Sequence, residues 1–391
     1  MEHRADIGIV GAGPAGARAA ELLAAKDVGV VLLDPKAPWE KPCGGGLTAH
    51  AFREIPELAE LESVARVVTS VRVETSPEDG FSIPLDHPIW MVPRRTLARW
   101  QLNRALRAGA EHLSVRVRDA RRAHGAWCLD TSDGELLVPF LVGADGAASL
   151  VRRVAAPGFD VELAPTRVAY PDGSGPYPDA VILKFYPGVS GYLWDFPRPS
   201  HRSVGVVIPN RTWRRPRMDG EIDEYRMSSD GRTSTGVQRA GAVIGTAQLG
   251  HGDYSAIAGP DFVLLGDAAG FADPFTGEGI QNALRSADLF ARAFTSGDPA
   301  AYPQLARRAF EWEFRIGRLL RRVLFDSGAG HRLVRGSLES KGWCALATAI
   351  LNGMNEHDGR VMGLVTRWAR TYRALRSVPG PPRRTRVPAT P

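Results

Sequence analysis

The chain has 391 residues, 44% of them hydrophobic, which is enough for two or three domains around a sizeable core. Its 49 Lys and Arg exceed its 43 Asp and Glu and give a net charge of +6, but the arginines are scattered and form no basic patch, which argues against nucleic acid as a partner. No apolar stretch approaches the length of a membrane span, and the three cysteines include no CxxC pair, which argues against disulfides and a metal centre.

The N-terminal segment has the pattern of a dinucleotide-binding βαβ unit. The start, MEHRADIGIV, enters an apolar run at 7–10 without a signal peptide, which predicts a cytoplasmic protein. Residues 11–16, GAGPAG, match GxGxxG; a helix is expected to about residue 26, and a strand over 28–33 ends at Asp34. The glycines permit a tight turn and close approach of a pyrophosphate, while Asp34 falls where a carboxylate can bind an adenosine ribose. The predicted contacts are Gly11, Gly13, Ala15, Gly16 and Asp34.

A glycine-rich loop follows this unit. It places Cys43 before Gly44, Gly45 and Gly46, and three consecutive glycines cost backbone entropy on folding. We therefore expect the loop to lie against a cofactor or a substrate. Cys43 has two interpretations, a small apolar filler and a functional thiol, because most free cysteines are inert.

The next segments mix helical and strand-like patterns. The predicted elements are a helix over 50–64, strands over 67–75 and 81–85, a helix over 96–107, and antiparallel strands over 113–118 and 127–131. Arg94 precedes the second helix and is a candidate cofactor contact. Asp133-Gly134 is expected to form a hairpin turn.

Two later segments repeat the arrangement of strand, glycine, acid and helix. The first contains Asp145 followed by Gly146, and the second is a strand over 262–265 that ends at Gly266-Asp267. A carboxylate at the position of Asp267 can accept hydrogen bonds from ribityl hydroxyls. Its alternative role is that of a cap in an ordinary strand–turn–helix.

A second glycine turn, Gly277-Glu278-Gly279, is predicted to open a helix from Ile280 to about residue 289. The N–H groups around Gly279 and Ile280 would then lie at the positive end of a helix dipole. Such a terminus suits the negative charge of a reduced flavin.

Between these segments the pattern changes to short strands separated by turns, over 180–186, 191–196 and 203–208. They predict an antiparallel sheet packed over the cofactor. Alternation along the middle strand places Tyr192, Trp194 and Phe196 on one face, either as a wall for a long apolar substrate or as ordinary sheet core. Residues 210–253 are expected to form loops and a short helix over 220–227.

The C-terminal part is helical in pattern over 301–325, 338–351 and 361–375, with Arg interleaved among apolar positions. A solvated helix face and peripheral contact with anionic lipid both explain this pattern. Residues 378–391 are rich in Pro and Arg and are expected to be disordered.

Taken together, the three glycine–acid segments resemble the FAD-binding motifs of the p-hydroxybenzoate hydroxylase-like flavoproteins. Within that fold, KPCGGGLT at 41–48 and YLWDFP at 192–197 resemble the loop and the YxWxFP signature of the geranylgeranyl reductase family. Two positions depart from the family pattern: Arg198 stands where a Lys is frequent, and Ala98 stands where an acid usually follows Arg94.

The resemblance implies a Rossmann-like FAD-binding domain (α/β) combined with an antiparallel-sheet substrate domain (α+β) and C-terminal helices. It implies FAD-binding segments at 1–66, 96–165 and 251–300, substrate-domain segments at 67–95 and 166–250, and helices in 301–377. Predicted cofactor contacts also include Gly44, Gly45, Gly46, Arg94, Asp145, Gly266, Asp267, Gly277, Gly279 and Ile280. The predicted catalytic residues are Cys43, Tyr192 and Trp194, and the predicted substrate contacts are Tyr192, Trp194 and Phe196.

The activity implied is reduction of isolated isoprenoid double bonds, with hydride delivered from reduced FAD and a proton supplied by an acid. The chain lacks a second strand–GxGxxG–helix for NADPH, so NADPH or an electron-donor protein is expected to dock transiently. An oxygen-dependent hydroxylase or halogenase is the rival enzyme class, because fold does not fix function. The non-enzymatic alternative is a flavin-loaded lipid-binding protein.

Overall fold

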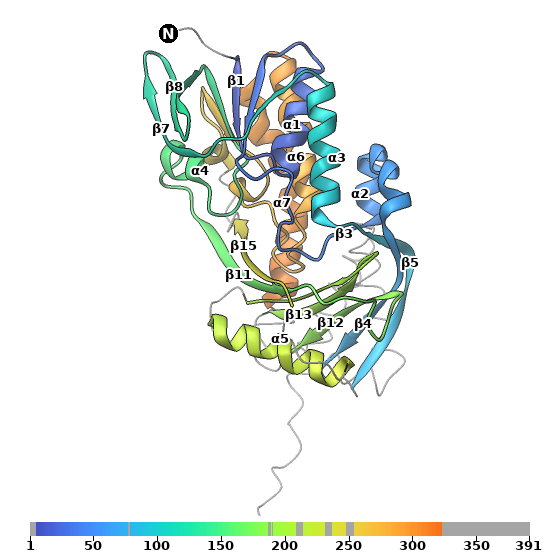
Figure 1. The fold of residues 1–391 in the computed structure, drawn as a ribbon. Coiled ribbons are helices and arrows are strands. Elements are labelled where there is room, and N and C mark those ends of the chain that lie inside the picture. Colours follow the sequence, from blue (N-terminus) through green and yellow to red (C-terminus); the bar gives the residue numbers. More distant parts are fainter. Residues whose placement is uncertain are drawn as a thin grey trace, which may run out of the picture.

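The structure is a computed structural model that describes residues 5–322 apart from 77–78, 187–188, 190, 209–213, 231–236 and 248–253. Its strands form two larger sheets and one small sheet within these residues, one larger sheet lying above the other in the view of Figure 1. The predicted helices over 338–351 and 361–375 and the predicted disordered tail lie outside the described residues. No described helix is both long and apolar enough to cross a bilayer.

The first sheet is parallel and carries the glycine motifs. Its strands run in the order β16 (Phe262–Leu264), β10 (Phe140–Gly143), β1 (Ile7–Val10), β2 (Val30–Leu33) and β6 (Glu111–Leu113). All residues of β1, β2, β10 and β16 are buried, as expected for parallel strands covered on both faces. The strands predicted at 7–10, 28–33 and 262–265 are therefore confirmed, although β2 starts only at Val30 and β16 ends at Leu264.

Three helices lie together beside this sheet. Helix α1 (Pro14–Ala24) packs against α3 (Arg94–Arg107) and α6 (Ile280–Thr295), and Figure 1 shows them close to one another in the upper part of the molecule. Helix α6 begins at the residue predicted for it but continues six residues beyond the predicted end at 289. Its long amphipathic face buries residues such as Ala287 and Phe290 in the core shared with α1.

A small antiparallel sheet consists of β7 (Val117–Ala123), β8 (Ala126–Thr131) and β9 (Gly134–Val138), and it contacts the short helix α4 (Leu150–Ala155). The turn predicted at Asp133-Gly134 is confirmed, with Gly134 at φ +114°. The prediction of one antiparallel strand over 113–118 is wrong. Leu113 ends the parallel strand β6, and β7 starts only at Val117, because Leu113 pairs with β2 while Val117 pairs with β8.

The second large sheet has the order β15-β11-β14-β13-β12-β4-β5-β3. Its strands are β3 (Gly46–Leu47), β4 (Arg66–Glu74), β5 (Gly80–Met91), β11 (Val161–Ala169), β12 (Ala180–Phe185), β13 (Tyr192–Pro197), β14 (Arg202–Val207) and β15 (Arg239–Ala247). Neighbours are antiparallel except β12 and β4, which are parallel. The predicted combination of an α/β domain with an antiparallel-sheet domain is confirmed.

Alternation along β13 separates the two faces of this sheet. Leu193 packs with Ile222 and Tyr225 of α5 (Arg215–Asp230), and Figure 1 shows α5 covering the lower face. Tyr192, Trp194 and Phe196 therefore share the opposite face, as predicted. The expectation of loops over 210–253 is wrong for β15, which pairs along its whole length with β11, and α5 is longer than the helix predicted at 220–227.

The predicted helix over 50–64 is also corrected. Helix α2 (Ala49–Glu54) stops before Ile55, and a 3-10 helix continues over Pro56–Val64. Ile55 has φ −132° and ψ 79°, outside the helical region, because a proline ring clashes with a helical residue before it. Helix α7 (Tyr302–Arg321) confirms the helix predicted to begin at 301 as far as the described residues extend.

Candidate active site

A cavity of about 760 Å³ lies where the carboxyl ends of the parallel strands face the second sheet. The turns after β1, β10 and β16 all line it, through residues 11–15, residues 144–148, and Leu265 with Asp267. Beyond the ends of β2 and β6, it is lined by Asp34, Lys36 and Arg116. This edge is where α/β folds bind dinucleotides, so the cavity is positioned as the sequence predicts.

The glycine motif after β1 fits a dinucleotide. Gly11 has φ +98°, and a Cβ there would lie 2.4 Å from the carbonyl oxygen of Ala144, while a Cβ on Gly16 would lie 1.8 Å from the oxygen of Gly11. A Cβ on Gly13 would meet no atom within 4 Å, so this glycine leaves space open. Asp34 accepts a hydrogen bond from the N–H of Ala12 at 3.0 Å, which fixes the carboxylate at the cavity wall.

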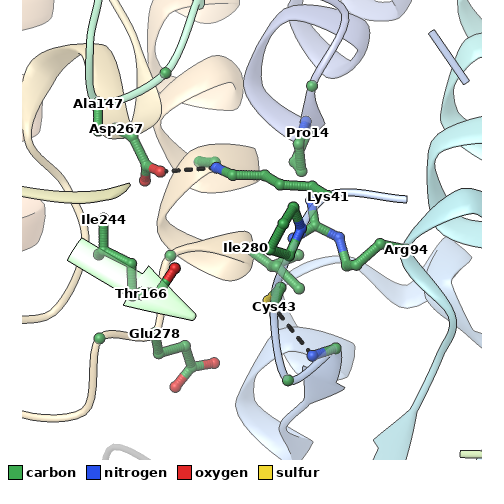
Figure 2. Close-up of a pocket in the computed structure, with 18 of the residues that line it drawn as sticks. Pro14, Lys41, Cys43, Arg94, Ala147, Thr166, Ile244, Asp267, Glu278 and Ile280 are labelled. Atoms are coloured by element: carbon green, nitrogen blue, oxygen red, sulfur yellow. Dashed lines mark hydrogen bonds and ion pairs between the residues drawn. The ribbon is translucent and has the colours of Figure 1, made fainter. Parts of the chain in front are cut away.

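The second acid of the motif set, Asp267, lies on a 3-10 turn after β16. Its Oδ2 is 3.0 Å from Nζ of Lys41, and Figure 2 shows the lysine side chain reaching across the cavity to it. Gly266 has φ +55° and is packed between Ala15 of α1 and Ala283 of α6. The carboxylate that we expect to meet ribityl hydroxyls thus faces the cavity with a cation beside it.

The turn before α6 is also built around the cavity. A Cβ on Gly279 would lie 3.1 Å from Oδ1 of Asp267, and Gly277 has φ +72° beside Ile244 and the hydroxyl of Tyr192. Ile280 is the first residue of α6 and lines the same cavity. The structure therefore brings the predicted helix terminus to the cofactor cavity.

The third acid, Asp145, is used differently. Its carboxylate accepts hydrogen bonds from the Ser149 hydroxyl and from the N–H groups of Leu150 and Val151, at 2.6 and 3.2 Å for the two backbone donors. Burial raises the pKa of Asp145. Asp145 lines the cavity, but its carboxylate oxygens accept hydrogen bonds from the first N–H groups of α4. Contact between Asp145 and a cofactor therefore stays a prediction.

A buried arginine holds the CGGG loop. Arg198 is fully buried, and it forms an ion pair with Glu40 at 2.5 Å and donates hydrogen bonds to the carbonyl oxygens of Cys43 and Gly44. Glu40 in turn accepts from the first two N–H groups of α3. Arg198 therefore joins the second sheet, the loop and α3, which the sequence did not predict.

The glycines of this loop also have a packing reason. A Cβ on Gly44 would lie 2.4 Å from the ring of Phe196, and one on Gly45, at φ +81°, would lie 2.6 Å from the carbonyl oxygen of Val92. Phe196 of the second sheet and Val92, between β5 and α3, therefore approach the loop closely. All three glycines also line the cavity, so contact with a cofactor stays a prediction.

Cys43 is half-buried and lines the cavity beside Arg94, as Figure 2 shows. Burial opposes ionisation of its thiol, but the guanidinium of Arg94, the N–H of Gly45 at 3.4 Å and Arg198 together hold the pKa of Cys43 below its ordinary value. Arg94 is 5% exposed, and its Nε has no hydrogen-bond partner among the described residues.

The aromatic face of β13 forms the wall opposite the glycine motif. Tyr192 donates its hydroxyl hydrogen bond to the carbonyl oxygen of Thr276, and burial raises the pKa of the phenol. Trp194 is 5% exposed, and its Nε1 donates to the Ser203 hydroxyl at 3.1 Å. Ser203 donates at 2.9 Å to the Cys43 carbonyl oxygen, so the wall is tied to the cysteine loop.

Next to this wall the cavity continues over aliphatic side chains of the second sheet. The strands β4, β5 and β12 supply Val71, Val73, Ile89, Met91, Val181 and Leu183. These residues and the three aromatic rings form one apolar surface, which we call the apolar lobe. Its apolar chemistry suits a hydrocarbon chain.

Sequence reasoning missed three residues that the structure brings to the site. Arg198 was noted only as a departure from a family Lys, and Lys41 and Glu40 were not singled out. Lys41 directly precedes Pro42 and Cys43, so its proximity to the cavity could have been inferred from the loop itself. The pairing of Glu40 with Arg198 spans 158 positions in the sequence, and no local pattern predicts it.

The chain is similar to known proteins in sequence and in fold. Residues 4–163 match the family described as an FAD binding domain. The geranylgeranyl diphosphate reductase of Rhodobacter capsulatus is 32% identical over 351 residues, which are 82% of this chain and 85% of that protein. The menaquinone reductase of Mycolicibacterium smegmatis is 30% identical over 365 residues, 83% and 85% of the two chains. A geranylgeranyl bacteriochlorophyll reductase-like structure from Thermoplasma acidophilum has a TM-score of 0.70 at 19% identity, covering 89% and 96% of the two chains.

The dinucleotide motif, the acid after β16 and the start of α6 meet in one cavity, and the sequence around the motif matches an FAD-binding family. The fold and the cavity therefore define an FAD-dependent oxidoreductase. Among these enzymes, the chain belongs to the geranylgeranyl reductase family.

Proposed function

We propose that this protein reduces carbon–carbon double bonds in an isoprenoid or similarly long apolar substrate. The observation that carries the proposal is the apolar lobe, which continues directly from the cofactor cavity along β4, β5, β12 and β13. A polyprenyl chain lying there would place its double bonds beside Cys43 and the aromatic wall. The names of the relatives, which include a geranylgeranyl diphosphate reductase and a menaquinone reductase, support an isoprenoid substrate.

Bound FAD supplies the hydride in this chemistry. Gly11, Gly13 and Asp34 would bind its adenosine and pyrophosphate parts, and Asp267 with Lys41 would lie along its middle. Tyr192, Trp194 and Phe196 would orient the substrate and keep water from the reacting carbons. The Cys43 thiol, lining the same cavity, would give a proton to the second carbon.

The source of the electrons is part of the same proposal. NADPH or an electron-donor protein would dock transiently to reduce the flavin, and the enzyme would work in the cytoplasm, peripherally at the membrane that holds its substrate. The Arg-rich exposed face of α7, with Arg308, Arg315 and Trp312, supports such a contact through anionic lipid. The segment boundaries expected from the sequence at 66, 95, 165, 250 and 300 stay predictions.

An endpoint assay tests the function. The purified holoenzyme is reduced with dithionite or NADPH without oxygen and incubated with geranylgeranyl diphosphate or with menaquinone, and products are analysed by mass spectrometry. The proposal expects geranylgeranyl diphosphate to become heavier by pairs of hydrogen atoms. Menaquinone should keep extra pairs of hydrogen atoms after its quinone ring has been reoxidised in air, because reduction of the ring alone also adds two hydrogen atoms. An aromatic substrate should remain unchanged, and oxygen should only drain electrons. A product that forms only with oxygen and contains a new oxygen or halogen atom would establish the rival monooxygenase or halogenase. Stoichiometric lipid binding without any product would favour the flavin-loaded lipid-binding protein.

A further inference from the structure

We propose that the guanidinium of Arg94 is the positioned positive charge that controls proton release by the Cys43 thiol. The sequence predicted Arg94 as a cofactor contact only. Arg94 lines the cavity, so that contact stays a prediction, and the structure also directs its side chain toward the thiol, as Figure 2 shows. The inference rests on the proposed function, because the proton released would be the one that the reduced double bond receives.

Arg94 is suited to this task because its charge is not committed elsewhere. Arg94 is 5% exposed. Within the part of the chain that the structure describes, its Nε has no hydrogen-bond partner and no carboxylate forms an ion pair with its guanidinium. Position 98, one turn along α3, holds alanine. Burying a guanidinium is costly unless an anion or a strong acceptor faces it, and the thiolate left by Cys43 is such an anion.

The other cation near the sulfur is already paired. Arg198 forms an ion pair with Glu40, and its remaining donors go to the carbonyl oxygens of Cys43 and Gly44. The negative charge of Glu40 offsets much of the field that Arg198 exerts on the sulfur. Removing the charge of Arg94 should therefore raise the pKa of the Cys43 thiol more than removing the charge of Arg198.

Two phenols lie close enough to Cys43 to interact with it electrostatically. Burial raises the pKa of Tyr170, on the residue after β11, to about 12, and it also raises the pKa of Tyr192 on β13. Both phenols are therefore neutral at neutral pH. They add no charge that could replace Arg94, and the N–H of Gly45 is the remaining donor to the sulfur.

The proton transfer balances without a further reagent. The S–H bond of Cys43 would break with its electron pair left on sulfur, and its proton would form the new C–H bond on one alkene carbon. The hydride that the flavin supplies would account for the C–H bond on the other carbon. Arg94 stabilises the thiolate that remains. The thiol is then restored by a proton from solvent.

The test titrates the thiol in the holoenzyme and needs no substrate. The rate of iodoacetamide modification of Cys43 is followed against pH by peptide mass spectrometry, because only the thiolate reacts. We expect the midpoint in the wild type to lie below that of free cysteine, about 8.5. In Arg94→Gln the midpoint should rise to a higher pH. At a fixed pH below both midpoints, the modification rate should then fall about tenfold for each pH unit by which the midpoint rises.

Three controls make the result specific. Arg94→Lys keeps the charge and should keep the low midpoint, and Arg95→Gln removes an exposed neighbouring charge from the same helix and should leave it unchanged. Cys128 is buried, and burial raises its pKa, so its peptide is the internal reference.

Equal midpoints in the wild type and Arg94→Gln would overturn the proposal, and Arg94 would then be only a cofactor contact. If Arg94→Gln does not fold, the titration of the wild type still tests the proposal. A Cys43 midpoint at or above that of free cysteine would also overturn the proposal. A protein that fails the double-bond assay but shows the Arg94-dependent midpoint would contradict the proposed function and leave the charge assignment intact.

Discussion

Replacing Arg198 by methionine is the most informative stability test of the site. Arg198→Met removes the positive partner of Glu40 and the donors to the Cys43 and Gly44 carbonyl oxygens. Breaking a buried pair by removing one partner costs ~3–5 kcal/mol. Glu40 is 21% exposed, and the Cys43 oxygen keeps its bond from Ser203, so we expect the lower end, about 3 kcal/mol.

Urea denaturation with a double-mutant cycle measures this loss. Glu40→Met should also destabilise the protein, and the double variant should recover most of the loss, because it leaves no unpaired charge buried.

Burial opposes ionisation of Glu40, but Arg198 and the N–H groups of α3 hold its pKa below its ordinary value of 4.5. A depressed carboxyl pKa gives stability that is present above the unfolded value and lost on acidification. The deficit of Arg198→Met should therefore shrink as the pH falls below 4.5. A pH-independent deficit, or no deficit at neutral pH, would refute the assigned role.

Three further substitutions test other parts of the site. Asp267→Ala should weaken FAD binding by ~1.5–3 kcal/mol through loss of a charge-assisted hydrogen bond, and an unchanged FAD dissociation constant would contradict this. Trp194→Ala should cost ~3–5 kcal/mol in a denaturation experiment because the indole is buried, whereas weaker substrate binding at constant stability would make it only a pocket wall. Cys43→Ser should leave flavin reduction intact but slow alkene-dependent reoxidation by ~10²–10⁴, and equal reoxidation rates would remove the thiol from the mechanism.

The parallel sheet could be predicted because its signals are local. A short apolar run followed by a glycine turn marks β1 and β16, and the backbone geometry of Gly11 and Gly266 explains why those residues are glycines. The sequence of β13 was sufficient to predict that its three aromatic side chains share one face, because successive side chains of a strand point to opposite faces of the sheet.

Other features depend on partners that are distant in the sequence. Strand β15 reads RAGAVIGTA, with small residues that indicate a loop, and it becomes a strand through its pairing with β11. The burial of Arg198 likewise follows from where Glu40 lies in space. The direction of the Arg94 side chain was missed because a motif gives a position along the chain and says nothing about which neighbour the side chain meets.

Anaerobic stopped-flow spectroscopy of the reduced holoenzyme tests the central claim most directly. Reduced flavin is mixed with a polyprenyl substrate in the strict absence of oxygen, and flavin absorbance is followed together with the mass of the product. The account predicts that the substrate alone reoxidises the flavin and gains two hydrogen atoms for each flavin oxidised. Flavin that stays reduced with every polyprenyl substrate until oxygen is admitted, and then yields an oxygenated or halogenated product, would contradict it.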